Sequence, residues 1–263
     1  MSEVALSLPV RWHPTVTAEE VDCREENGSY LERVWPLPAG QSALVMVDCW
    51  DTHPIESHLE RSGQIAREVI APLREACRAV GVTIIHAPSP PQARLYEQWT
   101  RYAAEAELGW SSGGAPEPWP PAEFRQRSGA FSLYERPTYL RGVERYLTDR
   151  RIVPELAPLP DEYVVATGAQ LHRLLRDRQI LHLLYAGFAT NMCVLHRDYG
   201  IIAMAARGYN CVLLREATCA IEAAATLPAE QLKESALLSV EMLWGVTASA
   251  TDLLTACQQA GGD

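Results

Sequence analysis

The sequence predicts an α/β fold: a doubly wound parallel sheet with helices on both faces. Short apolar runs without polar alternation suit strands buried on both faces. Amphipathic helical stretches separate these runs along most of the chain, as in a parallel sheet. With 263 residues and 48% apolar side chains, the chain is long and apolar enough for one large core. We therefore expect residues 1–263 to form a single domain.

The first 40 residues are expected to be an irregular lead-in. They carry prolines at positions 9, 14, 36 and 38 and show no clear period. The organised part begins with Ser42–Asp48, an apolar run that follows Gly40 and ends at an acid. This run predicts the first buried strand.

A strand–helix–strand unit is predicted next. From Ser62, which suits a helix N-cap, apolar residues recur with helical spacing until Gly81, which suits the C-cap. The run Val82–His86 then predicts a second buried strand. Strands joined in this way lie parallel.

The same alternation resumes in the second half of the chain. The expected strands are Glu162–Ala166, Leu181–Ala186 and Tyr209–Leu214, the expected helices are Ala169–Arg178, Val194–Arg207 and Pro228–Ser239, and Gly245–Ala256 closes the fold. In a sheet of this kind, ligands bind beyond the carboxyl ends of the strands. Candidate site residues are therefore those that follow strands.

An insertion, residues 87–155, separates the two halves. It is rich in Pro, Trp, Tyr and Arg, and it is too polar and too often interrupted by proline for a core sheet. Its aromatic content suits either a lid over the site or a contact between subunits. Both interpretations stay open.

Composition restricts the partners and the compartment. The 33 acidic and 23 basic residues give a net charge of −10, which disfavours nucleic acid and anionic membranes as partners. No run approaches the about 20 apolar residues of a membrane span, and the start lacks a signal-peptide pattern. Seven cysteines without CxxC pairs indicate free thiols in a reducing compartment. We therefore expect a cytoplasmic protein.

Cys193 and Asp48 are the candidate reactive groups. Cys193 lies where a predicted strand passes through a glycine-containing turn into a helix. Backbone N–H groups at a helix start lower the pKa of a thiol from about 8.5 and can hold an oxyanion. Asp48 ends the first strand, so it lies at the same sheet edge and can take the thiol proton. The alternative is that Cys193 packs the helix start and Asp48 caps a loop.

Four segments resemble the isochorismatase-like cysteine hydrolases. Residues 186–194, Ala-Gly-Phe-Ala-Thr-Asn-Met-Cys-Val, are similar to the nucleophile turn of that family. The other three segments are residues 42–48, 208–218 and 245–254. The resemblance implies a three-layer α/β/α hydrolase that cleaves amide, carbamoyl or ureido C–N bonds, or a vinyl ether, in a small molecule. It also implies a homo-oligomer, and we expect no cofactor.

The resemblance assigns roles to single residues. Asp48 is expected to be the base and Cys193 the nucleophile, with the backbone N–H groups of Thr190 and Cys193 as the oxyanion hole. A non-proline cis peptide is implied at Ala189–Thr190. Trp50, His53, His86 and Met192 are the residues expected to contact the substrate.

The triad of that family also needs a lysine, and this chain departs from it. The family position falls near Ala166, whereas the only lysine, Lys233, lies in a predicted late helix and suits a surface charge. Arg125 and Arg127 resemble the family's Lys-x-Arg pattern locally but occur too early, inside the insertion. Two hypotheses stay open: a hydrolase in which another side chain replaces the lysine, and a non-catalytic pseudoenzyme or small-molecule-binding protein.

A metal-assisted hydrolase is a further alternative. Asp51 and His53 follow the first strand, and His86 ends the second. Meeting at the sheet edge, these three side chains would suit zinc. Otherwise the histidines are hydrogen-bonded loop residues, or one of them replaces the lysine as the group that handles the proton.

Overall fold

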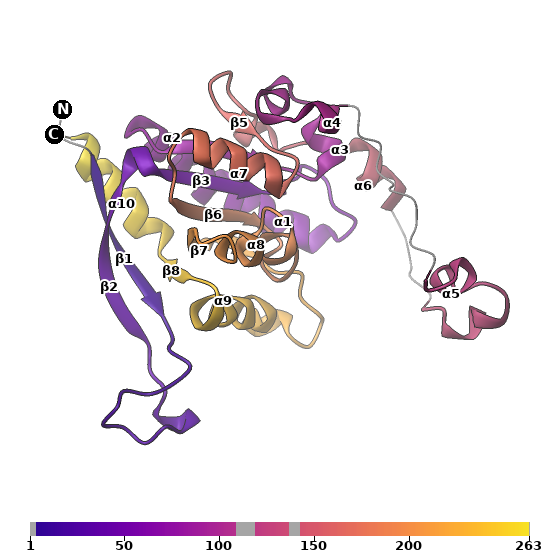
Figure 1. The fold of residues 1–263 in the computed structure, drawn as a ribbon, viewed down its shortest axis with the longest axis horizontal. Coiled ribbons are helices and arrows are strands. Elements are labelled where there is room, and N and C mark those ends of the chain that lie inside the picture. The colour runs from indigo at the N-terminus through magenta and orange to yellow at the C-terminus, as the bar shows by residue number, and fades with distance from the viewer. Residues whose placement is uncertain (1–3, 109–118, 137–142, 263) are drawn as a thin grey trace.

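The computed structural model describes residues 4–108, 119–136 and 143–262. An eight-stranded sheet with the order β2-β1-β8-β7-β6-β3-β4-β5 forms its centre (Figure 1). The strands are β1 (Ala5–Trp12), β2 (Leu31–Pro38), β3 (Ser42–Val47), β4 (Thr83–Ala87), β5 (Tyr163–Val164), β6 (His182–Phe188), β7 (Asn210–Cys219) and β8 (Val246–Ala248). Strands β3 to β8 pair in parallel, which confirms the predicted doubly wound sheet.

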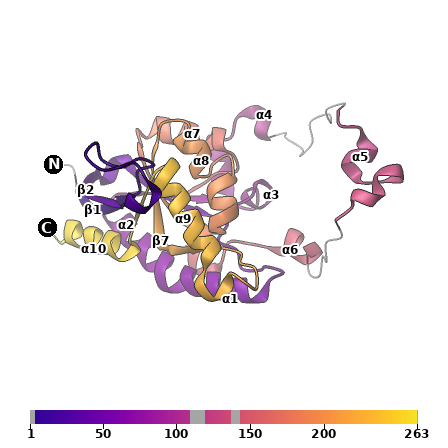
Figure 2. The same ribbon diagram turned by 90° about the horizontal axis from the view of Figure 1, so that it is seen from below.

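Helices cover both faces of the sheet, so the fold has three layers. The large helices are α1 (Glu56–Ile65), α2 (Ala71–Ala79), α7 (Gly168–Asp177), α8 (Ile201–Ala205), α9 (Gln231–Leu243) and α10 (Ala250–Gly261). Figure 2 shows α1 and α10 on one side of the sheet and α7 and α8 on the other. A π-helical stretch, Ala66–Ile70, joins α1 to α2. No helix in the described ranges has the length and apolar character needed to cross a membrane.

The central strand β3 is apolar and buried at every position because both of its faces meet helices. Leu44 and Met46 belong to the apolar core that includes Leu73 of α2. Val45 and Val47 belong to the opposite core, which includes side chains of α7 and α9. Successive side chains of β3 point to opposite faces of the sheet, so one continuous apolar run contributes to both cores.

The N-terminal segment is ordered, so the expectation of an irregular lead-in over residues 1–40 is wrong. Strands β1 and β2 form an antiparallel hairpin, and Val10 of β1 pairs with Ala248 of β8, which makes the sheet mixed. Leu6, Leu8 and Val10 alternate with exposed residues, as in a strand with one buried face. The prolines of β2 are tolerated because β2 is an edge strand.

Two predicted helices have different bounds in the structure. The first begins at Glu56, and Ser62 lies inside it, where its hydroxyl donates to the carbonyl of Leu59 (3.1 Å) instead of capping. The helix predicted over Val194–Arg207 is interrupted between residues 197 and 200. Gly200 lies there against the backbone of the preceding turn, and a Cβ would come within 2.8 Å of the Leu195 carbonyl oxygen.

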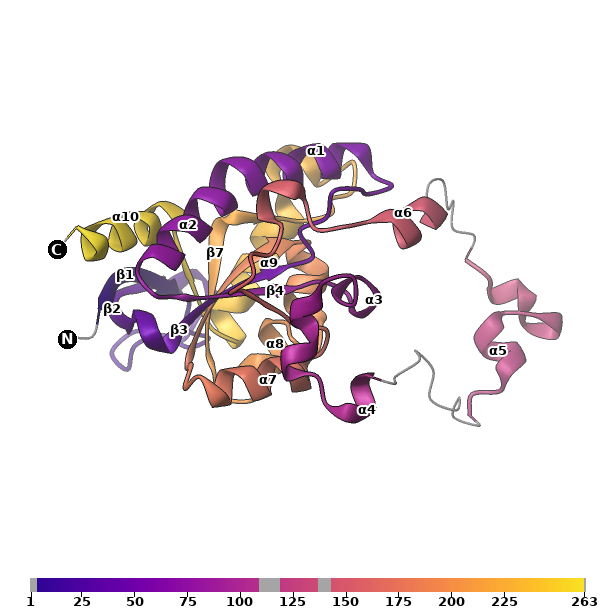
Figure 3. The ribbon, with the colours of Figure 1, turned by 90° about the horizontal axis from the view of Figure 1, so that it is seen from above.

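The two ends of the insertion are bonded to the body and to each other. Gln170 of the body donates to the carbonyl of Trp99, and the backbone N–H of Val153 donates to the carbonyl of Cys49 (2.9 Å). The helices of the insertion are α3 (Pro90–Ala93), α4 (Glu105–Leu108), α5 (Ala122–Gln126) and α6 (Val143–Asp149). The Tyr96 hydroxyl accepts from the backbone N–H of Ile152 (2.9 Å), and Gln92 donates to the carbonyl of Leu147 (3.2 Å). Helix α5 lies away from the sheet (Figure 3). The proline-rich run at 116–121 lies partly outside the described residues, and a lid or subunit contact stays a prediction.

Candidate active site

The geometry of the site begins with the contact between β3 and β6. These strands are parallel neighbours in which Val47 pairs with Gly187, so the residues that follow them share one sheet edge. Gly187 has a φ of +111°, and a Cβ there would lie 2.0 Å from the Val47 carbonyl oxygen. Glycine is therefore required at this position, and it brings Asp48 close to the turn that carries Cys193.

The turn after β6 is a π-helical segment, Thr190–Val194, that hydrogen bonds hold in place. The hydroxyls of Thr190 and Thr218 bond to each other (2.7 Å), and Thr218 donates to the carbonyl of Gly187 (2.7 Å). Asn191 bonds the backbone of Ile221 twice, at 3.1 and 3.2 Å. The non-proline cis peptide precedes Ala189, at Phe188–Ala189, one residue earlier than expected.

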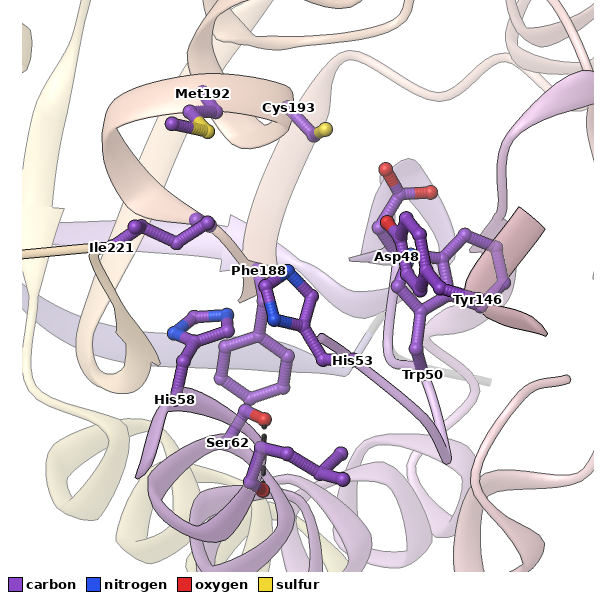
Figure 4. A pocket seen from close by; sticks show the side chains of 12 residues that line it. Asp48, Trp50, His53, His58, Ser62, Tyr146, Phe188, Met192, Cys193 and Ile221 are labelled. Atoms are coloured by element: carbon purple, nitrogen blue, oxygen red, sulfur yellow. Dashed lines mark hydrogen bonds between the residues drawn. The ribbon is translucent and has the colours of Figure 1, made fainter. Parts of the chain in front are cut away.

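A cavity of about 110 Å³ opens at this sheet edge (Figure 4). Among the residues predicted to touch a substrate, Trp50, His53 and Met192 line it together with Asp48 and Cys193. The sequence analysis did not select the other lining residues, which are His58, Leu59, Ser62, Tyr146, Phe188, Ala189 and Ile221. Tyr146 belongs to the insertion. Neither the residue pattern nor the family resemblance predicted which residue of the insertion reaches the cavity.

Asp48 and Cys193 both line the cavity, and their side chains point toward each other (Figure 4). The carboxyl group of Asp48 is 3% exposed. Burial raises the pKa of Asp48, although the adjacent Cys193 thiol and the charge of Arg197 oppose the rise. Burial and the negative charge of Asp48 raise the pKa of Cys193 to about 12. The lowered thiol pKa expected from the helix start is thus wrong, because burial and the adjacent carboxylate outweigh that effect.

Arg197 is the cation beside this pair, and sequence analysis missed it. Its Nη2 lies 3.7 Å from Oδ2 of Asp48, and its positive charge opposes the rise in the pKa of Cys193. The same Nη2 donates to Ser89 (2.6 Å), whose hydroxyl in turn donates to Oδ1 of Asp48 (3.4 Å). Arg197 follows Cys193 by four residues, a spacing that places both on one helix face and was the available signal.

Neither candidate lysine position contributes to the cavity. Ala166 is buried and lines a separate cavity with Trp99 and Glu107. Lys233 lies in α9, where its Nζ donates to Glu230 (3.0 Å), and its side chain is 15% exposed. It is therefore a partly buried, paired residue rather than the surface charge expected.

Two histidines at the cavity are neutral at pH 7. His53 and His58 lie edge to face with ring centroids 4.8 Å apart. Burial lowers the pKa of both, that of His58 to about 4. Nδ1 of His53 accepts from the backbone N–H of Ile55 (3.1 Å), so its proton resides on Nε2. His53 thus presents a neutral imidazole to a ligand.

His86 lies away from the cavity, so its predicted substrate contact is not supported by the geometry. Its imidazole donates to Glu162 (2.9 Å), which also accepts two hydrogen bonds from Arg74 (2.7 and 2.8 Å). The proposed zinc ligands are likewise not assembled, since Asp51 accepts from the backbone N–H of Arg151 (2.8 Å). Across the described ranges, no three His, Cys, Asp or Glu side chains gather in a metal-binding cluster.

The Arg74–Glu162–His86 group predicts a stability effect. Replacing Glu162 by glutamine leaves the Arg74 charge buried and unpaired, so the free energy of unfolding should fall by about 3–5 kcal/mol at pH 7. The hydrogen bonds to Glu162 hold its pKa at about 2, below the ordinary 4.5. Because this folded-state pKa is depressed, the ion pair stabilises above about pH 4.5 and loses its effect as the pH falls toward 2.

Urea unfolding at pH 7 and at pH 3 measures this difference. The matched control is Asp161→Asn, because the neighbouring Asp161 forms an exposed ion pair with Arg78 and should change stability by less than about 0.5 kcal/mol. Equal losses in Glu162→Gln and Asp161→Asn would refute the assignment.

Known proteins resemble this chain over most of its length. The sequence model of the isochorismatase domain matches residues 42–237. A ureidoacrylate amidohydrolase, RutB of Azorhizobium caulinodans, is 26% identical over 239 residues, covering 83% of this chain and 91% of that protein.

Solved structures share the fold. A cysteine hydrolase from Pseudomonas syringae pv. phaseolicola has a TM-score of 0.57 at 18% identity, covering 86% of this chain and 96% of that one. An isochorismatase family protein from Burkholderia thailandensis has a TM-score of 0.51 at 18% identity, covering 83% of this chain and 96% of that one. The sequence match covers well over half of the chain, and the chain therefore belongs to the isochorismatase domain family.

Proposed function

We propose that the chain is a hydrolase of amide, carbamoyl or ureido C–N bonds in small molecules, with Cys193 as nucleophile and Asp48 as base. The observation that carries the proposal is the meeting of the buried Asp48 carboxyl group and the Cys193 thiol at one cavity, where the two side chains point toward each other. The similarity to a ureidoacrylate amidohydrolase over 83% of the chain supports the bond type. A cavity of about 110 Å³ suits a small substrate.

The first half-reaction forms a thioester. Asp48 takes the proton of the Cys193 thiol, and the thiolate attacks the carbonyl carbon of the substrate. The backbone N–H groups of Thr190 and Cys193 are proposed to stabilise the oxyanion that forms. The C–N bond then breaks as the leaving nitrogen takes the proton from Asp48, and the acyl group remains on sulfur.

The second half-reaction releases the acyl group. Asp48 accepts a proton from water, whose oxygen attacks the thioester carbon, and the C–S bond breaks. The sulfur recovers its proton from Asp48, which restores the starting state. The raised pKa of Asp48 suits both proton transfers. It makes the carboxylate a stronger base when the thiol or water gives up a proton, and the protonated carboxyl group then returns that proton in the next step. These steps use groups of this chain alone, without a cofactor.

The variant Asp48→Asn tests the base. It should lower turnover by roughly 10²–10⁴-fold, the usual contribution of a general acid–base group. Asn also tolerates the left-handed backbone that Asp48 adopts (φ +46°), so the fold should be kept. Ammonia release from a panel of primary amides, carbamoyl compounds and ureido compounds measures turnover. Wild-type rates in Asp48→Asn would refute a proton-transfer role.

The same variant should be more stable than the wild type at pH 7. The folded-state pKa of Asp48 is raised, so its ionised form is disfavoured by folding and its contribution falls as the pH rises through that pKa. Removing the charge removes this cost. The gain should shrink as the pH is lowered, since wild-type Asp48 then becomes protonated, and urea unfolding at pH 5 and pH 8 measures it.

A second candidate is a non-catalytic small-molecule-binding protein. The pKa of about 12 for Cys193 favours it, because a thiol of that pKa carries little thiolate at neutral pH. Under this hypothesis, compounds of the panel bind without release of ammonia, and the mass of the intact protein shows no acyl adduct. Catalytic turnover with a transient adduct on Cys193 would exclude it.

A further inference from the structure

We propose that Arg197 is the third catalytic group of this site: its guanidinium pairs with the Asp48 carboxylate beside Cys193 and stabilises the thiolate with a fixed positive charge. This inference rests on the proposed function and names the residue that completes its machinery.

The placement of Arg197 follows from the local backbone. Its N–H donates to the carbonyl of Cys193 (3.2 Å), a helical bond that keeps the two residues one turn apart. The chain then leaves the helical path before α8 begins at Ile201. Arg197 is thus the last residue of this turn, and its side chain reaches back over the sheet edge where Asp48 ends β3.

Ser89 and Asp48 together define the position of the guanidinium. Nη2 donates to Ser89 (2.6 Å) and lies 3.7 Å from Oδ2 of Asp48. Its Nε is buried and has no hydrogen-bond partner among the described residues. Burying an N–H group without an acceptor costs free energy. The Nε–H of Arg197 is therefore expected to gain an acceptor when a ligand binds or when the charge of the site changes.

The chemistry that arginine supplies differs from that of lysine. A guanidinium stays protonated at all relevant pH values, so Arg197 cannot carry the proton. The proton of Cys193 therefore passes only to Asp48, and the negative charge moves from the carboxylate to the sulfur. Because Arg197 pairs with Asp48 and its charge also favours the thiolate, the moving charge stays close to the same cation before and after the transfer.

Ser89 is a positioning residue for this arrangement. It is buried two residues after β4, and its hydroxyl accepts from Arg197 while donating to Oδ1 of Asp48 (3.4 Å). A single hydroxyl thus links the cation and the carboxylate and fixes their relative orientation. It acts through its two neighbours, the Asp48 carboxylate and the Arg197 guanidinium.

The other ionisable groups near the pair do not replace Arg197. Tyr146 and Tyr199 face the pair, and burial raises the pKa of both, so they are neutral at pH 7. Arg150 lies over the rings of Trp50 and Tyr146, at 5.0 and 4.5 Å from their centroids, and donates to Gln92 (3.0 Å). The positive charge of Arg150 stabilises ionised Asp48. The positive charge of Arg197 stabilises both ionised Asp48 and the Cys193 thiolate.

Alkylation of Cys193 by iodoacetamide tests the proposal without a substrate. Cys23 is exposed and the five other cysteines are buried, so a Cys23→Ser background leaves Cys193 as the accessible thiol of the described chain. The rate is followed by intact mass between pH 7 and pH 10. Arg197→Met should slow alkylation at least about tenfold at each pH, as expected when the thiol pKa rises by one unit or more. Arg197→Lys, which keeps the charge, should restore most of the rate.

Controls separate charge from folding. Arg207→Met removes an exposed arginine near the end of the following helix and should leave the alkylation rate unchanged. If Arg197→Met does not fold, Arg197→Gln tests the loss of charge at similar length, and Ser89→Ala should slow alkylation by a smaller factor. Equal alkylation rates in wild type, Arg197→Met and Arg197→Gln would overturn the inference.

The outcome also distinguishes this inference from the proposed function. A charge-dependent alkylation rate in a protein that releases no ammonia from any compound supports the role of Arg197 at the thiol and contradicts the hydrolase. Turnover that persists at the wild-type rate in Arg197→Met contradicts the inference and leaves the roles of Asp48 and Cys193 intact.

Discussion

Replacing Cys193 by alanine is expected to abolish hydrolysis, with a residual rate at least about 10³-fold below that of the wild type. Without the sulfur no acyl-enzyme can form, and Asp48 loses the group from which it takes the proton. Ammonia release from the best compound of the amide, carbamoyl and ureido panel measures the loss.

The design includes a control for thiol chemistry elsewhere. Cys23→Ser alters the exposed cysteine and should keep full activity. Rapid quenching of the wild type with substrate should show an intact-mass increase equal to the acyl group, which is absent in Cys193→Ala. Because Cys193 lies at the cavity and is not fully buried, the variant should unfold at a urea concentration close to that of the wild type. Undiminished ammonia release in Cys193→Ala would contradict the nucleophile assignment.

Gly187→Ala is expected to have the largest effect on stability, a loss of about 4 kcal/mol or more or a failure to fold. A Cβ at this position would lie 2.0 Å from the carbonyl oxygen of Val47 and 2.7 Å from its nitrogen. Both are backbone atoms of the central strand, which cannot move without breaking the pairing of β3 with β6. The φ of +111° adds a backbone cost for any L-residue.

Two other glycines separate the steric clash of the Cβ from the backbone cost of the positive φ. Gly208 has a φ of +91° with open space around its Cβ position, so Gly208→Ala reports backbone strain alone and should cost about 1–2 kcal/mol. Gly40 has open space and no positive φ, and Gly40→Ala should change stability by less than about 0.5 kcal/mol. Urea unfolding of the three variants should give the order Gly40, Gly208, Gly187. A loss in Gly187→Ala no greater than in Gly208→Ala would contradict the clash.

The parallel part of the fold was predictable because its strands are buried on both faces. An apolar run such as Ser42–Val47 has no other stable environment in a chain of this composition, and a helix between two such runs fixes their direction. The meeting of Asp48 and Cys193 follows from that topology alone, since both come directly after parallel strands.

The N-terminal hairpin was missed for a physical reason. The alternation of Leu6, Leu8 and Val10 is the pattern of a strand, but Pro9 interrupts it and prolines recur in its partner. Proline is excluded from central strands and tolerated at an edge, so its meaning depends on the position of a strand in the sheet, which one sequence does not state.

Arg197 was missed and His86 was misjudged because their roles depend on tertiary contacts. The expected continuous helix through residue 207 gave no reason to single out Arg197, whereas the helix is interrupted there and the guanidinium lies 3.7 Å from Asp48. His86 follows the strand rule, yet Glu162 and Arg74 hold its imidazole within the protein. Sheet topology identifies the edge where a residue lies, and only packing decides whether its side chain reaches the cavity.

The hairpin of β1 and β2 forms one edge of the sheet. An exposed strand edge offers unpaired N–H and C=O groups to other chains and promotes aggregation. Here one outer strand, β2, carries prolines at 36 and 38, and the opposite outer strand, β5, has only two residues. A chain shortened to begin at Ser42 would lose β1 and leave β8 as an unprotected edge. Strands β1 and β2 thus cover the edge of β8, although they lie outside the stretch that matches the family.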